Sequence, residues 1–138
     1  MGKKFIIYGL IGWCAEVFWT GLGSLMKGDV LLSSFTSIWM FPIYGMAIFV
    51  EPLHNKIRGL PFIVRGSIYT IVFFSIEYTT GMFLKLILGA SPWDYSGSPL
   101  SINGVIRLDF IPIWFSAGII FEKIHDLLEG FSRVYFKN

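Results

Sequence analysis

The sequence predicts an all-α integral membrane protein with four transmembrane helices, built as a tandem parallel repeat of two helical hairpins. Three observations predict it: the composition, four long apolar runs, and matching motifs in the two halves. Hydrophobic residues make up 54% of the 138 residues, charged residues make up 14%, and the mean hydropathy is +0.67. A soluble domain carries about 25% charged residues. Lipid is therefore expected to cover most of the surface of one domain, residues 1–138.

The apolar runs are each close to the length of about 20 residues that a helix needs to cross a bilayer. We expect spans at about residues 5–25, 35–53, 62–88 and 105–127. Pro42 and Pro112 lie inside the second and fourth runs. Neighbouring helices can satisfy the backbone carbonyl groups that a proline frees in the membrane.

Lysine and arginine indicate the orientation, because they favour the cytoplasmic side. Eight of them lie at the amino end, between the second and third runs, or at the carboxyl end: Lys3, Lys4, Lys56, Arg58, Arg65, Lys123, Arg133 and Lys137. The opposite side holds three, namely Lys27, Lys85 and Arg107. The chain is therefore expected to be a multi-pass protein of the cell membrane, with both termini cytoplasmic and the 89–104 loop outside.

Matching motifs in the two halves predict the duplication. The matched pairs are Tyr8 with Tyr69, Glu16 with Glu77, residues 42–44 with residues 112–114, Glu51 with Glu122, and His54 with His125. Both hairpins would start from the cytoplasm, which gives a parallel repeat about an axis along the membrane normal. From Gly21 to Pro42 is 21 residues, whereas from Gly81 to Pro112 is 31. The second hairpin thus carries an insertion that includes residues 91–96.

Glu16 and Glu77 are the first candidates for a functional site, because each lies near the middle of an expected span. Ionisable side chains inside a membrane are costly, face the protein interior and often mark function. Small residues share the face of each glutamate, so the two helices are expected to pack together around the carboxylates. The carboxylates would bind a cation, a proton or a polar solute group. The alternative is that they only hydrogen-bond across the interface or stay protonated.

Other polar residues extend this candidate site. Arg107 opens the fourth span on the outer side and either reaches toward the carboxylates or snorkels to the interface. Trp93, Asp94 and Tyr95 form an unusual cluster in the outer loop. An aromatic belt at the membrane surface would explain Trp93 and Tyr95 but not Asp94, so a re-entrant lid over the carboxylates is the preferred explanation. A last group lies near the cytoplasmic surface: Glu51, His54, Glu122 and His125. A zinc site is conceivable there, but solvated helix ends are the preferred explanation, and no metal is expected.

Several function classes are not indicated. The sequence has no Walker A, HExxH or GxSxG motif, and no cofactor is expected. A net charge of +2, scattered along the chain, does not predict binding to nucleic acid.

Five blocks of sequence carry a resemblance to a known family: residues 12–21 (GWCAEVFWTG), 39–45 (WMFPIYG), 65–69 (RGSIY), 77–81 (EYTTG) and 92–96 (PWDYS). The chain resembles the small bacterial membrane proteins of the type IV ABC-transporter family, which have distant vertebrate transmembrane relatives. The resemblance covers nearly the whole chain, and the PWDYS block is its most specific part. It implies a role in transport. An ATPase would have to be a separate subunit, because the chain holds no nucleotide-binding domain.

The leading hypothesis is a membrane transport protein that acts as a homo-oligomer or as a permease subunit of a larger membrane complex. Glu16 and Glu77 would bind a small cationic or polar solute or a proton, and the 91–96 loop would be the outer gate. One alternative is a membrane enzyme that acts on a lipid or isoprenoid substrate. A glutamate would then be the general base, Arg107 the phosphate ligand and Asp94 an assisting acid. A second alternative is a non-catalytic partner subunit.

Overall fold

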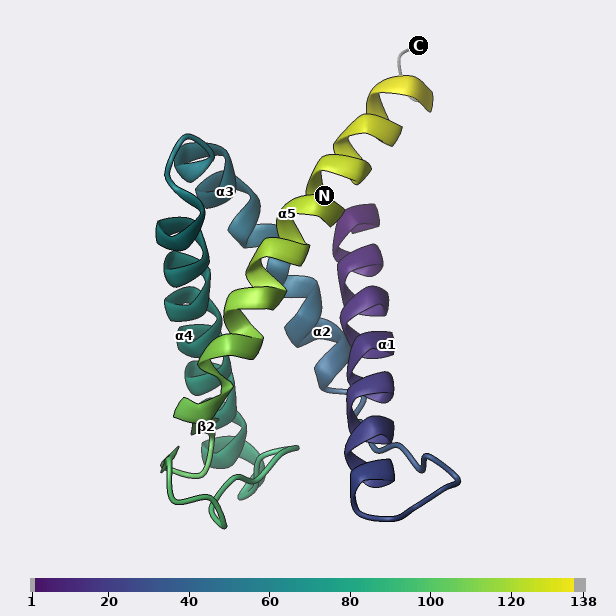
Figure 1. Ribbon diagram of the computed structural model, residues 1–138, viewed down its shortest axis with the longest axis vertical. Helices are drawn as coiled ribbons and strands as arrows, with labels where there is room; N and C mark the ends of the chain where they lie inside the picture. The colour runs from purple at the N-terminus through teal and green to yellow at the C-terminus, as the bar shows by residue number, and fades with distance from the viewer. Residues whose placement is uncertain (1, 136–138) are drawn as a thin grey trace. The chain divides into compact units, whose positions relative to one another are not determined.

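The computed structural model describes residues 2–135, with side chains as far as residue 131, and the chain is mostly helical (Figure 1). It forms two compact units, residues 1–50 and residues 51–138. Two of the charges used to predict orientation, Lys137 and the side chain of Arg133, lie outside the described part.

The first unit combines one long helix with a shorter helical segment. Helix α1 spans Gly2–Met26, and helix α2 (Met40–Gly45) leads into the 3-10 helix η1 (Met46–Val50). The loop after α1 turns at Asp29, whose carboxylate accepts hydrogen bonds from the backbone N–H groups of Leu31 (2.9 Å) and Ser33 (3.1 Å). Aspartate favours such turns because its short side chain can bond the backbone that follows.

Glycines let α1 and α2 approach closely. Gly9 lies against Phe41 and Gly12 lies against the Tyr44 ring, so a Cβ at either position would overlap its neighbour. Small residues have this role in many helix pairs within membranes. From the sequence, this face of α1 is expected to pack on the helix at residues 62–88. In the structure, the second helix of the same hairpin packs on it.

The second unit contains helices α3 (Glu51–Ile57), α4 (Phe62–Leu88) and α5 (Ile111–Tyr135). Helix α4 follows Pro61 and ends at Gly89, which adopts a left-handed conformation (φ 77°). Glycine is favoured at this position because the conformation is strained for other residues. Between α4 and α5, strands β1 (Ser101–Ile102) and β2 (Ile106–Arg107) pair antiparallel, and the 3-10 helix η2 (Leu108–Phe110) leads into α5.

Helices α4 and α5 run in opposite directions and pack through glycine contacts (Figure 1). Gly66 of α4 lies against the Phe115 ring, and Gly118 of α5 lies against Tyr69. Tyr69 is fully buried. As in the first unit, the glycine-bearing face of the long helix is occupied by the second helix of its own hairpin.

Two of the expected spans agree with the structure. Within residues 2–135, α1 and α4 are the helices that are long and apolar enough to cross a membrane. The bounds of α4 coincide with the expected range 62–88, and those of α1 differ from the range 5–25 by a few residues at the amino end. Long apolar runs with clear helix ends are the most readable signal in a sequence.

The second and fourth expected spans begin before the helices that the structure shows there. Residues 32–37 have no regular structure and helix begins at Met40, whereas α5 begins at Ile111, after the strands. Pro42 and Pro112 each fall in the first turn of a helix. Proline fits there because its missing N–H would have no carbonyl partner within the helix. The prolines therefore open these helices and do not interrupt them.

Candidate functional site

The Glu77 carboxylate lies where three segments of the second unit meet. It points from α4, and its side chain belongs to a residue that is only 8% exposed. The Tyr95 hydroxyl, from the 89–104 loop, donates to Oε1 (3.2 Å), and the Trp114 indole N–H, from α5, donates to Oε2 (3.0 Å). Both carboxylate oxygens therefore have a neutral donor.

The 89–104 loop folds back along α4 to reach this carboxylate. Glu77 lies about 16 Å before the end of α4, at ~1.5 Å per residue, and a tyrosine side chain in the loop nevertheless contacts it. Trp93 fixes the loop, since its indole N–H donates to the Val105 carbonyl (2.8 Å) and its ring lies against Gly81. The sequence predicts a lid over both carboxylates, and within the second unit the loop contacts that of Glu77.

Asp94 stabilises the turn inside this loop and does not contact Glu77. Its Oδ1 accepts hydrogen bonds from the backbone N–H and the hydroxyl of Ser96. These bonds hold the pKa of the exposed Asp94 carboxyl below its ordinary value. The Tyr95 backbone N–H donates to the Gly104 carbonyl (2.9 Å), which brings the Tyr95 side chain into register with α4.

Arg107 lies near the rings of Tyr95 and Phe110. Its guanidinium carbon is 4.5 Å from the centre of the Phe110 ring and 5.8 Å from that of Tyr95. Arg107 also bonds both carboxylate oxygens of Asp109 through Nε and Nη2. Tyr95 thus lies between Arg107 and Glu77, and the ion pair of Arg107 is formed with Asp109.

The Glu16 carboxylate in the first unit has a different environment. It accepts hydrogen bonds from the side chains of Tyr44 and Thr36. Its Oε2 is buried and has no hydrogen-bond partner among the described residues. The indole nitrogen of Trp13, one helical turn earlier, is also buried without a partner in the described chain. Trp13 lines an apolar groove of about 490 Å³ together with Leu10, Ile38, Trp39, Phe41 and Pro42.

A separate polar cluster lies where α3 meets the amino end of α4 and the middle of α5. The sequence predicts that these polar residues are solvated helix ends, and that prediction is wrong. The residues concerned are Glu51, His54, Glu122 and His125. His54 and His125 are each 2% exposed and Glu122 is 7% exposed. These side chains are therefore held inside the unit, between α3, the amino end of α4 and the middle of α5.

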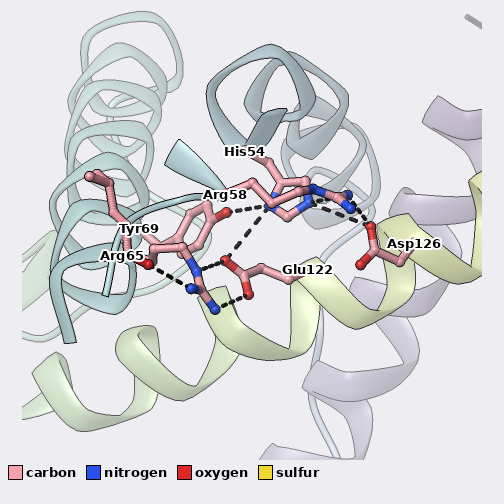
Figure 2. Close-up of polar contacts among 7 residues, drawn as sticks. His54, Arg58, Arg65, Tyr69, Glu122 and Asp126 are labelled. Carbon is pink, nitrogen blue, oxygen red and sulfur yellow. Dashed lines mark hydrogen bonds and ion pairs between the residues drawn. The ribbon is translucent and has the colours of Figure 1, made fainter. Parts of the chain in front are cut away.

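Figure 2 shows the chain of hydrogen bonds that supports this burial. Arg58 donates to Nε2 of His54 (2.9 Å), so the proton of the neutral ring is on Nδ1, which faces the Tyr69 hydroxyl (2.7 Å). The same Nδ1 lies 3.7 Å from Oε1 of Glu122. Arg65 completes the chain by binding both oxygens of Glu122, at 2.7 and 3.0 Å.

Charge is compensated along this chain. Arg58 also pairs with Asp126 of α5, and burial together with the positive charge of Arg58 lowers the pKa of His54. Buried charges persist only where partners satisfy them. The arginines therefore allow α3, α4 and α5 to join at a polar contact.

Sequence reasoning missed two residues that bond the glutamates, Tyr44 and Trp114. Both belong to the repeated Pro-Ile-aromatic motif, at matching positions. The motif was therefore a usable signal: an aromatic residue that can donate a hydrogen bond, repeated with the glutamates, indicates a shared contact.

Two comparisons with known proteins bear on identity. No solved structure gives a significant match to the chain. A family model described as "Putative ABC-transporter type IV" matches residues 3–135, which is nearly the whole chain. The family name indicates an ABC-transporter-related role, and the name together with the two long apolar helices supports a membrane location. The chain belongs to this ABC-transporter type IV family.

Proposed function

We propose that the chain is a membrane transport protein or permease subunit that binds a small cationic or polar solute, or a proton, at Glu16 and Glu77. One observation carries the proposal. Each glutamate lies in a long apolar helix and meets only neutral donors, and neither forms an ion pair within the described residues. A carboxylate in such a place is costly unless a proton or a cation neutralises it. A bound solute would supply that charge.

The groove in the first unit indicates the kind of solute. Glu16 Oε2 and the Trp13 indole nitrogen offer an acceptor and a donor without partners in the described chain. Trp13 also lines the apolar groove. A solute with an apolar body and one cationic or polar group would satisfy both features, since binding sites combine apolar walls with a few placed polar groups.

Contacts at matched positions support the proposed tandem repeat. The pairs of residues that match in the two hairpins are separated by 61 positions in the long helices and by 70 in the second helices. Glu16 bonds Tyr44, and the matched Glu77 bonds Trp114. Gly12 packs on Tyr44, and the matched Phe73 lies 5.6 Å from the Trp114 ring, centre to centre.

A third matched contact exchanges its two residue types. Phe5 of α1 packs on Gly45, and the matched pair is Gly66 of α4 with Phe115. One phenylalanine ring fills the contact in each hairpin. The long helix α1 supplies it in the first hairpin, and the second helix α5 supplies it in the second. Such an exchange preserves the packed volume, which is what a helix contact requires.

We further propose four spans with both termini in the cytoplasm, as the lysine and arginine bias indicates. In each hairpin, α1 or α4 would cross outward and the second helix would return. The 91–96 loop would be the outer gate, because Tyr95 is the loop residue that contacts Glu77. The protein would act as a homo-oligomer or with a separate ATPase subunit.

A carbodiimide that partitions into lipid tests the site, because it modifies carboxyl groups that are protonated in apolar surroundings. The purified chain in liposomes is treated with the reagent, with and without tetraphenylphosphonium as the cationic probe, and modified residues are mapped by mass spectrometry. We expect modification at Glu16 and Glu77 that the probe reduces. Glu16→Gln and Glu77→Gln should each abolish the modification at the altered site and impair probe transport.

The matched control is Asp29→Asn, which changes a carboxylate in a loop of the first unit and should leave both outcomes intact. If the probe gives no protection at either glutamate, and both glutamine variants transport it normally, the proposal is wrong.

The structure disfavours a membrane enzyme that uses Arg107 as its phosphate ligand. Both carboxylate oxygens of Asp109 already occupy the guanidinium. A phosphate would have to displace a bidentate partner of the same geometry.

A further inference from the structure

A cavity of about 490 Å³ in the second unit brings together side chains of α3 and α5. Glu51, His125 and Glu129 line it. Each offers one ligand atom, and these atoms all lie within 4.8 Å of one another. An imidazole nitrogen with two carboxylate oxygens is a common donor set for divalent transition metals.

Packing holds the central ligand in place. His125 is 2% exposed, and its ring stacks on Phe121 (centres 6.2 Å apart) and meets the edge of His54 (4.9 Å). Its Nδ1 is 3.2 Å from Oε1 of Glu51. Glu129 follows His125 by four residues on α5, which places both side chains on one face of the helix. The ligands are therefore arranged before any ion binds.

The proposed repeat supplies an internal comparison. Glu51 and His54 match Glu122 and His125 with a separation of 71 residues, and the same separation matches Arg58 with Glu129. The structure pairs these residues reciprocally, because His54 Nδ1 is 3.7 Å from Glu122 and His125 Nδ1 is 3.2 Å from Glu51. The cluster therefore contains two related His–Glu pairs.

The two pairs differ in the charges around them. At the His54–Glu122 pair, Arg58 bonds His54 and Arg65 binds Glu122. At the His125–Glu51 pair, the position that matches Arg58 is Glu129, a carboxylate. Arg58 also lines the cavity but pairs with Asp126. Two arginines thus contact the His54–Glu122 pair, whereas Glu129 and the cavity adjoin the His125–Glu51 pair.

We propose that Glu51, His125 and Glu129 bind one divalent transition-metal ion, such as Zn²⁺, with water from the cavity in the remaining coordination positions. The ion would take the place of the direct Glu51–His125 contact and link α3 to α5. An imidazole ligand favours Zn²⁺ over Mg²⁺, which prefers oxygen donors and retains its water. This site is separate from Glu16 and Glu77, so it can stand or fail independently of the proposed transport function.

The test uses the full chain, purified in detergent and treated with a chelator. ZnCl₂ is titrated calorimetrically, and CoCl₂ is added in parallel because its visible spectrum reports coordination by nitrogen and oxygen. We expect one ion per chain. Glu129→Gln and His125→Ala should each weaken Zn²⁺ binding at least about tenfold, since even residues that only support metal ligands have effects of that size.

Two further variants make the test specific. Glu129→Arg introduces the residue found at the matched position, and should abolish Zn²⁺ binding while helix content and thermal unfolding stay close to those of the parent chain. Asp126→Asn alters the same cavity outside the proposed ligand set and should retain binding. Circular dichroism of every variant separates a lost ligand from a lost fold.

Three results would overturn the proposal. One is Zn²⁺ binding of equal strength in the parent chain and in Glu129→Arg. Another is loss of binding in Asp126→Asn but not in Glu129→Gln, which would assign the ion to His54, His125 and Asp126. The last is equally strong binding of MgCl₂, which would exclude a site selective for transition metals.

Discussion

The two hairpins hold their central glutamates in related but unequal surroundings. Glu77 receives a hydrogen bond on each oxygen, one of them from Tyr95 in the 89–104 loop. Glu16 bonds Tyr44 and Thr36, and its Oε2 has no partner in the described residues. The aromatic donor on the second helix is the common element, whereas the loop donor belongs to one hairpin.

The difference follows from the insertion. The second hairpin has the longer connection between its helices, and the added residues include Trp93 and Tyr95, which fold back to Glu77. The first hairpin has a shorter loop and leaves an apolar groove beside Trp13. A single scaffold thus supports a covered carboxylate and an incompletely satisfied one. In a transporter, such a pair would let the solute meet two sites of unequal access.

The largest expected effect concerns the exchanged phenylalanine and glycine. Gly66→Phe places a second ring against Phe115 and should destabilise the protein by more than about 3 kcal/mol, because extra methylene groups alone cost about 1–3 kcal/mol; thermal unfolding in detergent measures the loss. Adding Phe115→Gly reproduces the arrangement of Phe5 and Gly45 and should restore most of the loss. Gly23→Phe is the control, because no atom lies close to a Cβ there. A double variant no more stable than Gly66→Phe would contradict the matched packing.

Tyr95→Phe should make Glu77 resemble Glu16. It removes a hydrogen bond to a carboxylate, a contact worth about 1.5–3 kcal/mol when the acceptor is charged. The rate of carbodiimide modification at Glu77 should rise toward that at Glu16. Tyr78→Phe is the control, since the Tyr78 hydroxyl bonds Asn103 of the same loop. An unchanged rate at Glu77 would show that the loop does not protect it.

A smaller effect is expected from Arg107→Lys. Lysine keeps the positive charge beside Asp109 but cannot make two parallel bonds to one carboxylate. If the glutamates bind a cation, probe transport should change little. A severe loss of probe transport would contradict a site in which the glutamates alone bind the cation.

The smallest effect is a dependence of the loop on pH. The folded pKa of Asp94 lies below its ordinary value, so its ionised form stabilises the turn above about pH 4. This contribution should be lost as the pH falls through the folded pKa. Trp93 fluorescence should then report a looser loop, and Asp94→Asn should remove that acid transition. The measurement uses a variant that keeps Trp93 as its only tryptophan, so that the fluorescence change is assigned to this loop.

The sequence could predict the long helices but not their partners. One apolar run, bounded by Pro61 and Gly89, defines α4. The ends of a helix can be predicted because they depend on residues next to them in the chain. The start of α5 could not be read in the same way, since apolar residues continue on both sides of Arg107 and Asp109 across β2 and η2 and hide the change of structure. Pro112 was the available signal, through its preference for a first helical turn.

The candidate site was predictable only where a single helix determines it. Glu16 and Glu77 stand out because a carboxylate in an apolar run is costly. Their partners Tyr44 and Trp114 depend on how two helices rotate against each other, which no local pattern specifies. The burial of His54 and His125 was missed for a related reason, since it depends on two arginines, Arg58 and Arg65, that bond side chains of other segments.

The exchange of phenylalanine and glycine between the hairpins has a consequence for assembly. In the proposed repeat, each long helix could pair with the wrong returning helix, because the two hairpins would share one contact surface. If α1 met α5, Phe5 would face Phe115, and if α4 met α2, Gly66 would face Gly45. The first mismatch crowds two rings and the second leaves a hole, so both wrong pairings are disfavoured. The same contact that holds each hairpin together thus identifies the correct partner, as discrimination between close alternatives requires.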